Sequence, residues 1–66
     1  MIKVGSLVEY HGIEYPECRG TIGLVRSLDA NEYKEPTAIV DFFSLCVIPE
    51  NHPVKLDYLQ EIEVKE

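Results

Sequence analysis

The sequence predicts an all-β domain folded as a small five-stranded barrel. Short segments rich in β-branched and aromatic residues recur along the chain, turn-forming residues separate them, and no long helical pattern is present. A barrel is favoured over an open sheet because closure removes exposed strand edges. The 66 residues make one domain, 1–66, whose core supplies only about 3–5 kcal/mol of net stability.

Five segments carry the strand pattern, and the last alternates polar and apolar residues with a period of two. The segments are SLVEY (6–10), GTIGLVRSL (20–28), TAIVDFFSLCVI (37–48), PVKL (53–56) and QEIEV (60–64).

The connections contain proline, asparagine and aspartate, which favour turns. Loops are expected at 13–19, 29–36 and 49–53. Before the last strand, Asp57–Leu59 is interpreted as one tight turn of 3-10 type. The spacing of the nearby leucines and isoleucine is also compatible with a short helix.

Two glycines, Gly20 and Gly23, interrupt the second strand three residues apart. Glycine inside a strand marks a bulge, a tight bend or a close approach of backbones. We therefore expect a strongly coiled strand that leaves a turn, in which Cβ atoms would obstruct the bend.

The stretch V-G-S-L-V-E-Y-H-G (4–12), followed by R-G-T-I-G-L-V-R-S-L (19–28), resembles KOW-type and related SH3-like barrels. These typically open with a turn of glycine and a small polar residue, then alternating strand residues, a glycine turn and Gly-x-x-Gly-x-Val. V-D-F (40–42) and L-Q-E-I (59–62) look like the third strand and the end of such a barrel. The matching positions are Gly5 and Ser6 in the first turn, Val8 and Tyr10 facing inward, and Gly20, Gly23 and Val25 in the second strand.

The resemblance implies a five-stranded SH3-like barrel with a short 3-10 turn before the last strand. The chain departs from the family pattern in two respects. IEYPEC (13–18) is inserted between the two halves of the motif, and the chain is acidic where the family's loops are usually basic. The fold therefore carries over better than the nucleic-acid function, because one fold hosts many functions.

The net charge argues for a protein partner and against nucleic acid. The chain contains twelve Asp and Glu residues and six Lys and Arg residues, which gives a formal charge of -6. Most nucleic-acid binders are basic. Acidity also serves solubility alone. No apolar run reaches the ~20 residues of a membrane span, and the amino terminus lacks the apolar stretch of a secretory signal. We expect a cytoplasmic protein with Cys18 and Cys46 reduced.

Metal and catalytic chemistry have little support in the sequence. The pairs His11/Cys18 and Cys46/His52 suggest a zinc set, but their spacing is wider than the usual C-x₂₋₄-C pair. The alternative is a buried Cys46 with two surface histidines. No nucleophile elbow, phosphate loop or metalloprotease motif is present. We expect no cofactor, no metal and no enzyme activity.

Alternation along two strands predicts a second apolar face outside the barrel. If the third strand directs Ala38, Val40 and Phe42 inward, its other residues face outward, and an inward Val25 likewise directs its neighbours outward. The candidate partner-binding residues are Phe43, Ile39, Leu24, Ile22, Asp41 and Tyr15.

Two interpretations of this face stay open at the level of sequence. Either it binds a partner, or the loops at 11–19 and 46–53 cover it. The covering side chains would be Tyr15, Pro16, Val47 and Ile48.

These observations predict a small acidic protein-interaction module with an accessory or regulatory role, which binds a protein partner and is capable of self-association. On size and charge alone, the roles considered for this chain include that of a viral protein acting on host machinery. The alternative is a KOW-like module on a ribosome or polymerase, in which aromatic residues stack on RNA bases. Its RNA contacts would be Arg19, Arg26, Lys34 and Lys55, with Tyr10, Tyr15 and Tyr33 as stacking residues.

Overall fold

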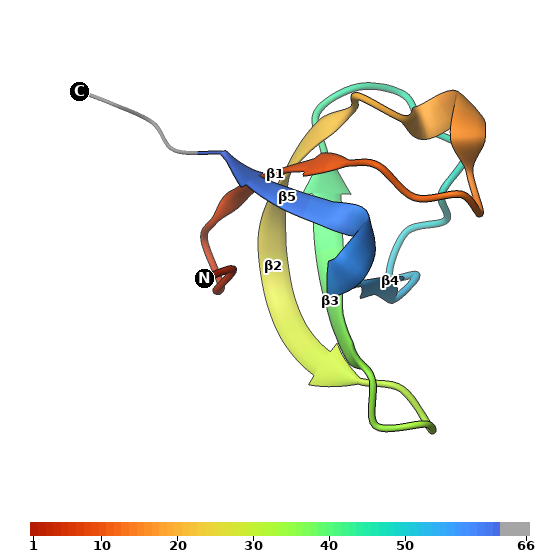
Figure 1. Ribbon diagram of the computed structural model, residues 1–66. Coiled ribbons are helices and arrows are strands. Elements are labelled where there is room, and N and C mark those ends of the chain that lie inside the picture. Colours follow the sequence, from red (N-terminus) through yellow and green to blue (C-terminus); the bar gives the residue numbers. More distant parts are fainter. Residues whose placement is uncertain (63–66) are drawn as a thin grey trace.

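Five antiparallel strands form a single sheet in the computed structural model, which describes residues 1–62 (Figure 1). The spatial order is β4-β3-β2-β1-β5. The all-β class and the 3-10 turn before the last strand are confirmed. The elements are β1 (Leu7–Tyr10), η1 (Pro16–Cys18), β2 (Ile22–Ala30), β3 (Pro36–Phe42), β4 (Val54–Lys55), η2 (Leu56–Tyr58) and β5 (Leu59–Ile62).

Hydrogen bonds do not close this sheet into the expected barrel. β4 and β5 occupy its two edges, and η2 joins them. β4 has only two residues, which pair with Thr37 and Ala38 of β3. Because the chain enters η2 directly after Lys55, no length of β4 remains to form a ladder with β5.

The third predicted strand is too long. β3 ends at Phe42, and residues 43–53 form a loop although 43–48 is an apolar run. The loop is joined to η1 through a disulfide between Cys18 and Cys46, and Ile48 is buried in the core. Only Cys46 and Ile48 of this segment face the core, whereas Phe43, Leu45 and Val47 are exposed, so its apolarity is only partly explained by packing.

Other boundaries shift by a few residues. β2 begins at Ile22 and extends to Ala30, which pairs with Pro36, so the loop predicted at 29–36 is shorter than expected. β5 begins at Leu59. Residues 63–64 of the predicted last strand lie outside the described residues.

The core lies on one side of the sheet, and the alternation in β1 shows why. Val8 and Tyr10 are 0% and 1% exposed, whereas the alternate residues Leu7 and Glu9 point the other way. Val40 and Phe42 of β3 pack against this core, as predicted. The buried apolar residues are Val8, Tyr10, Cys18, Val25, Ala38, Ile48, Val54 and Leu59.

Gly20 and Gly23 serve different purposes. Gly20 has φ +89° in the turn before β2, a backbone conformation that residues other than glycine rarely adopt. Gly23 lies opposite Phe42, and a Cβ there would come within 2.6 Å of Val40 Cγ1 and 2.8 Å of the Asp41 carbonyl oxygen. The β-bulge itself lies beyond both glycines, where the register shifts between Val25 and Ser27.

Candidate protein-binding surface

Apolar side chains lie in register across three strands on the side of the sheet opposite the core. Leu7 of β1 pairs with Leu24 of β2 on one side and with Ile62 of β5 on the other. Residues directly opposite each other in antiparallel strands present their side chains on the same face. Leu24 is 38% exposed, and Leu7 and Ile62 are half-buried.

Phe43 and Ile22 extend this surface towards the end of β3. The Phe43 N–H donates to the Ile22 carbonyl oxygen at 3.0 Å, so the register continues one residue beyond β3. Ile22 is 40% exposed and Phe43 64% exposed. We call Leu7, Ile22, Leu24, Phe43 and Ile62 together the outer strip.

The neighbouring loops pack against the core and leave the outer strip open. Ile48 is buried in the core, and Tyr15 packs against it. Tyr15 also places its ring 5.6 Å from that of His52 and donates its N–H to the Tyr10 hydroxyl at 3.3 Å. The two loops therefore contact each other through the Tyr15 and His52 rings and the Cys18–Cys46 disulfide, and in Figure 1 the chain around η1 (orange) lies near the loop that follows β3.

The predicted site residues are only partly brought together. Ile22, Leu24 and Phe43 share the outer strip, whereas Tyr15 lies on the core side of β1. Asp41 lies opposite Leu24 and 3.6 Å from the Arg26 guanidinium. This ion pair separates Ile39, which is half-buried, from the strip.

Sequence reasoning missed Leu7 and Ile62. The signal for Leu7 was present, because Val8 and Tyr10 were expected inside and alternation then places Leu7 outside. Ile62 required knowledge that β5 pairs with β1 in the register Leu7 to Ile62. Segment patterns alone do not specify a pairing between the two ends of a chain.

The expectation of two reduced thiols is wrong for this structure. Cys18 and Cys46 form a disulfide with their Cα atoms 5.8 Å apart. The insertion at 13–18 and the loop after β3 both lie over the core, which brings the two cysteines together. Two cysteines 28 positions apart carry no local signal of such a bond.

The four side chains considered for zinc do not converge. The disulfide occupies both sulfurs. His11 Nε2 lies 2.9 Å from the Glu9 carboxylate, while His52 Nε2 lies 3.9 Å from that of Glu14. Within residues 1–62, no group of three or more His, Cys, Asp or Glu side chains is arranged to hold a metal ion.

Three of the four cations considered for RNA contacts are engaged within the chain. Arg19 Nε donates to the Gly12 carbonyl oxygen at 3.0 Å. Arg26 contacts Asp41 and donates to the Asn51 side chain. Lys55 Nζ lies 3.3 Å from the Glu35 carboxylate.

No family model, curated protein or solved structure matches this chain. In the part of the chain that the structure describes, no helix has the length and apolarity needed to cross a bilayer.

Proposed function

We propose that this chain is a small, non-enzymatic protein-interaction module that binds its partner through the outer strip. The observation that carries the proposal is the register of exposed and half-exposed apolar side chains across β5, β1 and β2, which the adjacent loops leave open. Contiguous exposed apolar surface commonly marks a site of protein interaction.

The charge around the strip supports a partner with basic residues around an apolar centre. Glu9 lies beside the strip, opposite Ile22 and Gln60, and Asp41 lies opposite Leu24. The whole chain carries a formal charge of -6. Complementary charges at the rim of an interface raise the association rate and select among partners.

The proposal extends to the fold, which we assign to the SH3-like architecture. Its support is the strand order β4-β3-β2-β1-β5, together with a 3-10 turn between the last two strands. The glycines at positions 5, 20 and 23 agree with the motif that suggested this family.

Two adjacent phenylalanines provide the test of the binding surface. Phe43 is 64% exposed, whereas Phe42 packs against the core with its ring 6.2 Å from that of Tyr10. Phe43→Ser should preserve the melting temperature within a few degrees. Phe42→Ser should lose about 2–4 kcal/mol of unfolding free energy through lost core packing.

Binding is measured by parallel capture from lysate with folded baits. A specific partner should be retained by the wild type and lost by Phe43→Ser and by Leu24→Ser. The control is Val47→Ser, which alters a 59% exposed side chain in the 43–53 loop and should retain the partner. Sedimentation of the same baits detects self-association through the strip. The outer strip would be ruled out as the binding surface if the wild type and the three variants captured the same partner equally and no variant lost self-association.

A further inference from the structure

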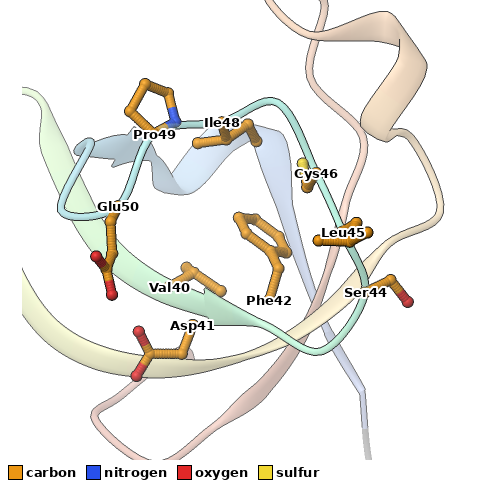
Figure 2. Close-up of a pocket in the computed structure, with 9 residues that line it drawn as sticks. All are labelled: Val40, Asp41, Phe42, Ser44, Leu45, Cys46, Ile48, Pro49 and Glu50. Atoms are coloured by element: carbon orange, nitrogen blue, oxygen red, sulfur yellow. The ribbon is translucent and has the colours of Figure 1, made fainter.

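A pocket of about 360 Å³ lies between β3 and the loop that follows it (Figure 2). Ligand clefts commonly have volumes of roughly 300–1,000 Å³. Apolar side chains of Phe42, Leu45 and Ile48 surround the space, and the carboxylates of Asp41 and Glu50 lie at one end. The pocket lies at the edge of β3 and is distinct from the outer strip.

The register of the sheet shows where the main chain of β3 directs its polar groups. The Val25 N–H donates to the Ser6 carbonyl oxygen, and the Val25 carbonyl accepts from the Gly5 N–H, both at 2.9 Å. Val25 therefore directs both groups towards β1. Because these directions alternate along an antiparallel strand, Leu24 directs its groups towards β3, where it lies opposite Asp41.

It follows that Asp41 bonds to β2, whereas Val40 and Phe42 direct their N–H and C=O groups away from it. β4 does not meet these groups, because it pairs only with Thr37 and Ala38. Within residues 1–62, the 43–53 loop makes no hydrogen bond to the main chain of Val40 or Phe42 either. The pocket thus borders a short stretch of unpaired strand edge.

An unpaired edge is a template for another strand, and side-chain pockets beside it provide specificity. We infer that an extended peptide segment of a partner protein binds here by adding a strand beside Val40–Phe42. Residues of the peptide opposite Val40 and Phe42 present their side chains on the same face as these two residues. Those peptide positions are therefore apolar and enter the pocket.

Charge indicates that the alternate positions of the peptide are basic. Among the described residues, Glu50 has no cation within ion-pair distance, and the one cation within that distance of Asp41 is Arg26. Two copies paired edge to edge about a two-fold axis at Val40–Phe42 would bring these carboxylates close to their own equivalents, and like charges facing each other are unfavourable. The occupant is thus a foreign segment with alternating apolar and cationic residues.

The probe is the peptide acetyl-Lys-Val-Lys-Val-Lys-Val-amide, titrated into ¹⁵N-labelled protein with its disulfide intact. We expect amide chemical-shift changes concentrated in residues 40–50. The amides of Val40 and Phe42 should exchange with solvent about tenfold more slowly when the peptide is bound, because they gain hydrogen bonds.

Two controls separate strand addition from simple attraction. A peptide N-methylated at its valines lacks the donors that face β3 and should not bind, although its charge and apolarity are retained. Glu50→Lys should weaken binding of the unmodified peptide about two- to fivefold, the size of an exposed ion-pair effect. Glu32→Lys changes the charge equally in the loop between β2 and β3, which does not line the pocket, and should have a smaller effect.

Several results would overturn the inference. These are unchanged shifts at residues 40–50 in millimolar peptide, equal binding of the N-methylated peptide, or shifts confined to Leu7, Leu24 and Ile62 of the outer strip. If the amides of Val40 and Phe42 exchange more slowly as the protein concentration is raised without peptide, the edge would be assigned to a second copy of the chain. None of these outcomes depends on the function proposed for the outer strip.

Discussion

At the scale of single residues, Gly23 is the position where the fold tolerates a side chain least. A Cβ there would lie 2.8 Å from the Asp41 carbonyl oxygen and 3.0 Å from Phe42 Cα, both main-chain atoms of β3. Since the backbone itself must move to make room, we predict that Gly23→Val costs at least about 1–3 kcal/mol. Urea denaturation checks this prediction. Ser27→Val, at an exposed site in the same strand, should change the stability by less than about 0.5 kcal/mol.

An ion pair with a predictable pH dependence joins Glu35, in the hairpin between β2 and β3, to Lys55 of β4. Hydrogen bonds from Asn31 and then Lys55 hold the pKa of Glu35 below its ordinary value of 4.5. The same contact with Glu35 raises the pKa of Lys55 above 10.5. The stability that Glu35 contributes is therefore present above pH 4.5 and lost as the pH falls through its folded pKa. That of Lys55 is present below pH 10.5 and lost as the pH rises through its folded value.

Melting temperatures measured between pH 2 and pH 8 test the acid side of this prediction. Glu35→Gln should reduce the decline below pH 4.5, and Glu32→Gln, in the same loop, should leave it unchanged. An identical acid decline in the wild type and Glu35→Gln would show that the pair does not contribute.

At the scale of elements, the disulfide joins η1 to the loop after β3. It closes a loop of 28 residues, which stabilises the folded state by about 3–4 kcal/mol through restriction of the unfolded chain. We predict that reduction, or Cys46→Ser, lowers the unfolding free energy by an amount of this order. Urea curves with and without a reductant measure it. Identical midpoints, with oxidation verified by a mass two daltons below the reduced chain, would contradict the prediction.

The same elements show what the sequence could and could not predict. Alternation predicted the inward residues Val8 and Tyr10 of β1 and Ala38, Val40 and Phe42 of β3 correctly, since one face of each of these stretches packs on the core. It failed for the apolar segment 43–48, because periodicity does not distinguish a strand from a loop packed on a core. For the outer strip, Ile22, Leu24 and Phe43 followed from local alternation. Ile62 depended on a long-range pairing that no local pattern specifies.

At the scale of the whole molecule, we expect the acidic charge and the internal pairing of the cations to act together against RNA binding. The formal charge is -6, and Arg19, Arg26 and Lys55 contact groups of the chain itself. We predict no binding of a single-stranded uridine 15-mer by fluorescence anisotropy, even at about 50 mM salt, where phosphate contacts are strongest. Binding that weakens steeply as salt is added would favour the KOW-like alternative.

The position of β1 between β2 and β5 has a consequence for synthesis of the chain on the ribosome. β1 is synthesised before its neighbours, and β2 follows soon after it, but the other edge of β1 has no partner until Leu59–Ile62 of β5, the last of the five strands, has been made. Until then the nascent chain presents an unpaired edge with Leu7 beside it, and such edges associate with other chains. Nascent chains halted before Leu59 should therefore bind chaperones. Chains extended through Ile62, with Ile62 outside the exit tunnel, should release these chaperones.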